Sequence, residues 1–329
     1  MKVWHSNRNS QLILSYYLET VREFGFIPLV TQSDPGTENF GVANAQTLLR
    51  QTLDPSLAGF IQHRWMRQKK NVMPEIAWSQ LRRRFTPGFE NLLDEGVNAG
   101  WYDFNNTLQR MVFRWLFILW LQQALDAYVD RVNNTPKRRD HNKVLPHGVP
   151  LLIHTSSQNY GALDFKITVT PELINYTSQQ YITPSHPVFD LVPPVLSAFI
   201  GECYDSLGRP PMVRTSVWQV YRKLLAVIQQ RTETPVLLTA IATDPTNDPI
   251  LDELHLLPDQ EDLPFRDSEG DYYMGGIGGG MGLHMLLDNL VDEDEPNVEI
   301  DDVDAPPALL ITAFSDEEVE VEDNIDEEA

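Results

Sequence analysis

Acidic residues are distributed very unevenly along this chain of 329 residues. Residues 1–150 contain 18 Lys or Arg against 13 Asp or Glu, whereas residues 151–329 contain 7 against 34. The net charge of −22 therefore comes from the second half, which carries −27, while the first half carries +5. Residues 291–329 alone hold 17 of the acids. Such a segment cannot bury enough apolar surface to offset the entropy lost on ordering, so we expect the folded part to end well before it.

The rest of the composition is typical of a globular protein inside the cell. The single cysteine, Cys203, excludes an internal disulfide framework and a thiolate metal cluster, and it favours a reducing compartment. The first residues include no apolar signal segment. The longest apolar block, at 111–125, is interrupted by Arg114 and is shorter than the roughly 20 residues that span a bilayer. We expect a soluble protein that is nuclear or cytoplasmic, is not secreted and has no membrane partner.

Hydrophobic periodicity predicts an α/β chain in which helices dominate. The predicted helices cover residues 10–25, 42–53, 74–96 and 103–135, and an apolar strand is expected at 26–33. A basic loop at 136–150 ends the first predicted domain, 1–150. Residues 151–232 are expected to form a small, mainly helical domain, with helices at 172–182 and 216–231. Residues 233–329 are expected to form a low-order acidic tail that is rich in Pro and Gly.

Two short motifs place acids where α/β proteins form ligand sites. In "SDPGTEN" (33–39), Asp34 directly follows the predicted strand, and Gly36 permits a tight turn. A carboxylate at the carboxyl end of a strand lies at the edge where such sheets bind ligands, although Asp and Gly are also common in ordinary turns. In "NVMPEIAWSQLRRRF" (71–85), Asn71 precedes Glu75 by four residues at the start of a predicted helix. Asp34 and Glu75 are 41 positions apart.

These two motifs, in this order and at this spacing, resemble the integrase core of retroviruses and related elements. The resemblance is more specific to the integrase-core proteins of fungal genomes, which derive from transposable elements. It extends over the leading helix and strand, the Trp-rich helix at 103–134 and "NKVLPHGVP" (142–150), and thus covers about the first half of the chain. It implies a partial RNase H-like domain related to DNA integration. It also implies that Asp34 and Glu75 are two of the three carboxylates that hold paired Mg²⁺ ions, and that Asn71 positions DNA or the Glu-bearing helix beside them.

The sequence departs from this family in one catalytic ligand. The family needs a first aspartate on the first strand of the sheet, and the acids that precede Asp34 are Glu19 and Glu23, both on a predicted helix. Two carboxylates without the third hold Mg²⁺ loosely. We therefore expect a pseudoenzyme without integrase or nuclease activity, with no Mg²⁺ unless the site is complete, and with residual nucleic-acid binding.

Basic clusters surround the two motifs. They comprise Arg64, Arg67, Lys69, Lys70, Arg82, Arg83 and Arg84 around Glu75, and Lys137, Arg138 and Arg139 in the later loop. From the residues alone, these clusters are as typical of a solvated helix face as of a phosphate-binding surface. The resemblance favours contact with DNA, or with RNA. Trp65 and Trp78 could stack on bases, but we expect Trp78 to lie in the core on the same side of its helix as Leu81.

The acidic tail supports an alternative of another class. A non-catalytic regulatory factor would bind basic protein partners through the tail, in which "ALLITAF" (308–314) is an apolar island. The Gly-rich stretch at 272–284 lacks the Lys and Ser or Thr of a phosphate-binding loop and is typical of a flexible linker. His141, His147 and His154 are too irregularly spaced to predict a zinc site.

Overall fold

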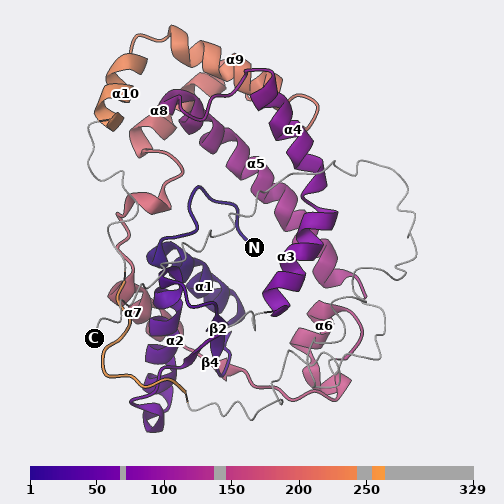
Figure 1. Ribbon diagram of the computed structural model, residues 1–329, viewed down its shortest axis with the longest axis vertical. Coiled ribbons are helices and arrows are strands. Elements are labelled where there is room, and N and C mark those ends of the chain that lie inside the picture. Colours follow the sequence, from indigo (N-terminus) through magenta and orange to yellow (C-terminus); the bar gives the residue numbers. More distant parts are fainter. Residues whose placement is uncertain (67–71, 137–145, 243–253, 264–329) are drawn as a thin grey trace, which may run out of the picture.

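The computed structural model describes residues 1–66, 72–136, 146–242 and 254–263, and helices account for most of them (Figure 1). The helices are α1 (Ser10–Phe24), α2 (Phe40–Leu53), α3 (Val72–Arg84), α4 (Pro87–Asn98), α5 (Thr107–Asn134), α6 (Pro150–Thr155), α7 (Pro171–Tyr181), α8 (Pro194–Ser206), α9 (Val217–Gln230) and α10 (Thr234–Ala242). The strands are β1 (Phe26–Ile27), β2 (Thr31–Ser33), β3 (His63–Trp65) and β4 (Ile167–Thr168). Among the described helices, none has the length and apolar character needed to cross a membrane.

Helix α1 has clear start and stop signals. The Asn9 side chain accepts hydrogen bonds from the backbone N–H groups of Gln11 and Leu12, at 2.9 and 3.1 Å. Gly25 ends the helix in the left-handed region, with φ of 73°. The predicted helix at 10–25 is therefore present almost to the residue.

The predicted strand at 26–33 is divided into two. β1 pairs antiparallel with β4, while β2 pairs parallel with β3, so the chain changes partner within this short segment. Pro28 lies between the two strands and has no N–H to offer a ladder. The expectation of one continuous strand was wrong because alternation of apolar residues does not show where the pairing partner changes.

The predicted helix at 74–96 is also divided. α3 ends at Arg84, and α4 begins with Pro87 in its first turn. Proline removes a backbone donor and clashes with the preceding turn, so a single helix could not continue through it.

The described residues form three hydrophobic clusters, and the two larger ones each combine residues from both sides of residue 150. One core joins α1 and α2 to α7, with Leu14, Leu18, Leu49 and Ile174 fully or almost fully buried. The other joins α5 to α8 and α9, as Figure 1 shows in its upper half. The boundary at 150 stays a prediction, but packing does not separate the segments on either side of it.

The second core has a close contact between α4 and α9. A Cβ added to Gly96 would lie 1.9 Å from the Trp218 ring, and the Trp218 Nε1–H donates to the Leu92 carbonyl at 2.6 Å. Only a residue without a side chain allows this approach. Gly96 therefore sets the distance between these two helices.

Two parts of the segment predicted as a tail have described structure. One is α10, and the other is residues 254–263, which we call the strap and which Figure 1 draws in orange beside α2. Asn44, 1% exposed, holds the strap with both ends of its amide: Nδ2 donates to His255 O at 2.8 Å, and Oδ1 accepts from Leu257 N at 2.9 Å. The expected tail therefore includes a segment fixed to the first core.

We predict that Gly96→Ala destabilises the protein by about 1–3 kcal/mol, because the new methyl group overlaps the Trp218 ring. Gly201→Ala in α8 is the matched control. Its new Cβ would meet only one atom, Trp115 Cζ2 at 4.0 Å, so the better helix propensity should leave stability equal or raise it by about 0.5–1 kcal/mol. Urea unfolding midpoints measure both effects. Equal shifts for the two variants would contradict the close contact.

Candidate nucleic-acid interface

A pair of parallel strands forms the centre of the candidate site. Thr31, Gln32 and Ser33 of β2 lie opposite His63, Arg64 and Trp65 of β3, and α2 forms the connection between the strands. The carboxyl ends of parallel strands meet at one edge, where α/β proteins bind their ligands. Asp34 follows β2 at this edge, as predicted, and the chain leaves β3 at the same edge towards α3.

The turn after β2 presents the Asp34 carboxylate outwards. The Asp34 carbonyl accepts hydrogen bonds from Gly36 N at 2.8 Å, Ser33 Oγ at 2.9 Å and Asn39 Nδ2 at 3.2 Å. The side chain is exposed, and within the described part of the chain its carboxylate forms no hydrogen bond or ion pair. The backbone thus fixes the turn, and the carboxylate remains available for a ligand.

Glu38 lies in the same turn, and its carboxylate occupies the space beside Gly36. Gly36 has an extended backbone, with φ of −99°, so a left-handed conformation is not the reason for it. A Cβ at this position would instead lie 2.2 Å from Glu38 Oε1, which also accepts from Asn39 Nδ2 at 3.0 Å. The turn therefore holds a second carboxylate close to its own backbone.

A buried histidine joins β2 to β3 beneath this turn. His63 is 1% exposed; its Nδ1 lies 2.8 Å from Thr31 Oγ1, and its Nε2 lies 2.9 Å from Ser33 Oγ. Because the Ser33 hydroxyl donates to the Asp34 carbonyl, it can only accept from Nε2–H, which leaves Nδ1 to accept from Thr31. The network thus assigns the neutral Nε2–H tautomer. Burial lowers the pKa of His63 to about 4.

Sequence reasoning missed His63, because a single histidine within "QHRWM" has no spacing signal. Its ring packs on Trp65, with centroids 4.4 Å apart, and Trp65 in turn meets Phe40 edge to face at 5.6 Å. These contacts leave Trp65 partly buried. It therefore supports the strand pair as well as lying at the predicted interface.

Helix α3 carries the second motif. Glu75 lies in its first turn, which agrees with the predicted helix start. Arg82, Arg83 and Arg84 form its last turn and are all exposed. Arg64 lies on β3 and is half-buried. Of the other predicted site residues, Arg67, Lys69, Lys70, Asn71, Lys137, Arg138 and Arg139 lie outside the described residues.

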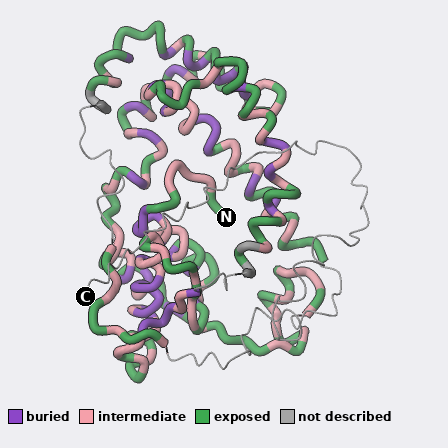
Figure 2. The backbone as a smooth tube through the Cα atoms, viewed as in Figure 1, coloured by how far each residue is buried: buried purple, intermediate pink, exposed green. Residues whose placement is uncertain are grey.

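Trp78 is exposed, which corrects the expectation that it belongs to the core. Its exposed fraction is 59%, whereas Leu81, one turn later, is 5% exposed and packs with Leu125 and Tyr128 of α5. Helix α3 contacts α5 through Leu81 and Phe85 near its C-terminal end, so Trp78 lies beyond that contact. Figure 2 shows α3 largely in green, the colour of exposed residues. Trp78 and Arg82 are four residues apart and share one helix face.

The described residues contain no group of three or more His, Cys, Asp or Glu side chains arranged to hold a metal ion. The exposed Asp34 carboxylate is a suitable oxygen ligand for Mg²⁺. The two acids before it, Glu19 and Glu23, are exposed on α1, and Glu19 pairs with Lys2 at 3.0 Å. The donors described around Asp34 therefore do not by themselves form a two-metal site.

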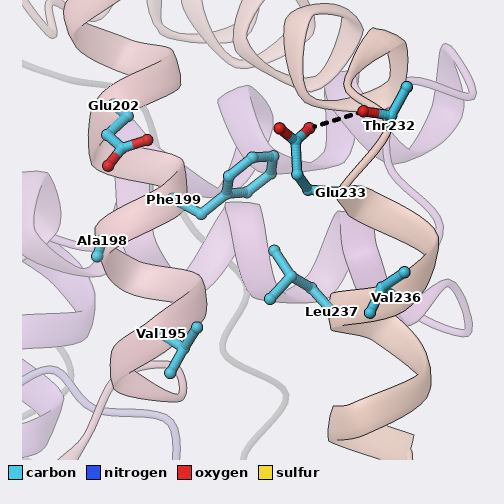
Figure 3. Close-up of a pocket in the computed structure, with 8 residues that line it drawn as sticks. All are labelled: Val195, Ala198, Phe199, Glu202, Thr232, Glu233, Val236 and Leu237. Atoms are coloured by element: carbon cyan, nitrogen blue, oxygen red, sulfur yellow. Dashed lines mark hydrogen bonds between the residues drawn. The ribbon is translucent and has the colours of Figure 1, made fainter.

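An apolar groove lies at the other end of the molecule. Val195, Ala198 and Phe199 of α8 face Val236 and Leu237 of α10, and the groove has a volume of about 690 Å³ (Figure 3). Its two ionisable lining residues are both acids, Glu202 and Glu233, and Glu233 accepts a hydrogen bond from Thr232 at 3.3 Å. This groove is acidic, whereas the face of α3 is basic.

The family model for the integrase core domain matches residues 1–159. The match covers β2, β3, α3 and α5, and so includes every element of the site described above. No curated protein and no solved structure matches the chain.

We predict that the protein loses stability as the pH is lowered, through the titration of His63. The pKa of about 4 in the folded state lies below the ordinary value of 6.5, so between these values the unfolded chain binds more protons. The free energy of unfolding should therefore fall by about 2 kcal/mol from about pH 7.5 to about pH 5 through this residue. Urea unfolding of the wild type and of His63→Gln isolates this effect, because other titrating groups are common to both. The same pH dependence in both proteins would contradict a buried neutral His63.

Proposed function

Because residues 1–159 belong to the integrase core domain family, we propose that this protein binds nucleic acid through a surface that we call the α3 face, formed by Trp78, Arg82, Arg83 and Arg84. The observation that carries the proposal is the exposure of Trp78, with Arg82 on the same face of α3 and Arg83 and Arg84 exposed in the same last turn. The bases of a single strand stack on exposed indole rings. Arginine side chains nearby would bind the phosphates of the same strand.

The position of α3 supports this reading. Its C-terminal end is held against α5 by Leu81 and Phe85, so the arginines project from a fixed helix. Asp34 and Arg64 lie at the edge from which the chain continues to α3. A strand of DNA or RNA on the α3 face would then also lie near Arg64. A nuclear or cytoplasmic location, where nucleic acid is accessible, is part of the proposal.

The family is related to DNA integration in transposable elements, and its catalysis uses Mg²⁺. We propose that this polypeptide retains the binding function without the reaction. Asp34 and Glu75 would be the metal ligands that correspond to the family motif. A bound Mg²⁺ would supply charge to stabilise a phosphodiester oxygen, and the residues of this chain would position the nucleic acid beside it. Glu19 and Glu23 lie on α1, so neither supplies the family's first aspartate on a strand.

We predict that Arg82→Gln combined with Arg83→Gln weakens binding to a labelled duplex about tenfold or more at low salt. Each lost phosphate contact should also lower the slope of log affinity against log salt by about 0.9. The matched control is Arg8→Gln with Arg22→Gln, two exposed arginines outside the α3 face, and it should change affinity less than twofold.

Trp78→Ala should weaken single-strand binding by about 1–3 kcal/mol with little change in the salt slope. Fluorescence anisotropy at several salt concentrations measures all three.

Equal losses in the two double variants would show binding by net charge alone and would overturn the assignment to α3. The regulatory alternative predicts a different result. In that case, basic proteins would bind residues 285–329, and the full chain would not retain nucleic acid at any salt concentration.

We also predict no strand-transfer or nuclease activity of this polypeptide with Mg²⁺ or Mn²⁺, because the third carboxylate of the family motif is not supplied on a strand. Purified protein and Asp34→Ala should give the same background on a labelled DNA substrate. A metal-dependent product that disappears in Asp34→Ala would show that the site is complete and that the protein is an enzyme.

A further inference from the structure

The strap fixes the point from which the C-terminal acidic segment leaves the described structure. Besides its two bonds to Asn44, it receives a hydrogen bond from Gln51 Nε2 to Gln260 Oε1 at 2.7 Å, and Leu254 N donates to Ser10 Oγ at 3.2 Å. Leu254 also packs against the core formed by α1, α2 and α7. The strap is therefore held at both ends, and Leu263 is its last described residue.

The direction of the strap is set by backbone pairing. Glu261 forms a parallel bridge with Phe60: Ile61 N donates to Glu261 O at 2.9 Å, and Glu261 N donates to Gly59 O at 2.8 Å. Because the pairing is parallel, the strap runs in the same direction as the segment that enters β3. At Glu261 the strap therefore runs in the direction of β3, towards the edge that carries Asp34.

The segment that follows is almost purely anionic. After Arg266 the sequence contains no Lys or Arg, and residues 291–329 hold 17 acids. We propose that residues 291–329 bind the α3 face of their own chain and compete there with nucleic acid. This inference rests on the proposed function. Carboxylates in series offer the arginines of the α3 face the same anionic contacts as a phosphate backbone, and the apolar island at 308–314 offers Trp78 an apolar partner.

The connection between the strap and residue 291 is long. Residues 264–290 number 27 and include the Gly-rich stretch at 272–284, and a random coil of 27 residues has a mean end-to-end distance of about 30 Å. Tethering at this range gives an effective concentration on the order of millimolar. The acidic groove between α8 and α10 would repel the same segment through Glu202 and Glu233 (Figure 3). Charge therefore directs the segment to the basic face and away from the acidic one.

The test compares three proteins: the full chain, a chain that ends at residue 290, and a full-length chain in which the 17 acids are replaced by Asn or Gln. The second and third should bind a labelled duplex at least about fivefold more tightly than the first at low salt, and the advantage should shrink as salt screens both contacts. The neutralised chain separates the effect of charge from that of length. Equal affinity for all three proteins would overturn the inference.

A second readout does not depend on nucleic acid. Zero-length coupling of carboxylates to lysines should join residues 291–329 to Lys69 and Lys70, which directly precede α3 in sequence, more than to the exposed control Lys223 on α9. Arg82→Gln with Arg83→Gln should reduce this coupling. If the coupling occurs but no variant binds nucleic acid, the proposed function fails and the intramolecular contact stands. If binding occurs without selective coupling and without a gain on truncation, the intramolecular contact fails alone.

Discussion

The burial of α5 is the constraint on which the rest of the structure depends. A helix of 28 residues with apolar side chains along most of its length must be covered on several sides. Its first half packs against α8 and α9, and its second half receives α3 through Leu81 and Phe85. The N-terminal segment covers a further side, where Val3 N donates to Gln122 Oε1 at 2.6 Å. Helix α3 packs on the part of α5 that α8 and α9 do not cover, and this contact sets the orientation of α3 and of its arginines.

Among the residues with described side chains, α3 packs against α5 near its C-terminal end, whereas α9 is buried along its length. α9 places seven residues in the core, whereas α3, among its residues with described side chains, contributes Leu81, and Phe85 packs there directly after the helix. A helix with so little buried surface gains little stability from packing, and propensity alone rarely maintains a short helix. Its exposed tryptophan and arginine-rich last turn are the residues that the proposed binding of nucleic acid uses.

The local elements were largely predictable from sequence, and the pairing between them was not. Helix α1 was predicted almost to its ends because Asn9 and Gly25 act through the nearest residues. The division of residues 26–33 into β1 and β2 depends on β3 and β4, of which β4 lies more than 130 residues away. Asp34 was found because a strand followed by an acidic turn is a local pattern. His63 was missed because its partners, Thr31 and Ser33, become neighbours only when the strands pair. The sequence analysis placed Trp78 in the core wrongly. The spacing between Trp78 and Leu81 shows that they share a face of α3, but it does not show how far along α3 the contact with α5 extends.

The bonds from Asn44 to the strap also have a consequence for synthesis on the ribosome. The strap partners of Asn44 lie 211 and 213 positions later in the chain. While α1 and α2 emerge and fold, this amide has neither of those partners, and an unsatisfied buried amide costs about 1–3 kcal/mol. The first core can therefore reach its full stability only after residues 254–263 have been translated. Until then the Asn44 amide of α2 has neither of its partners in the strap.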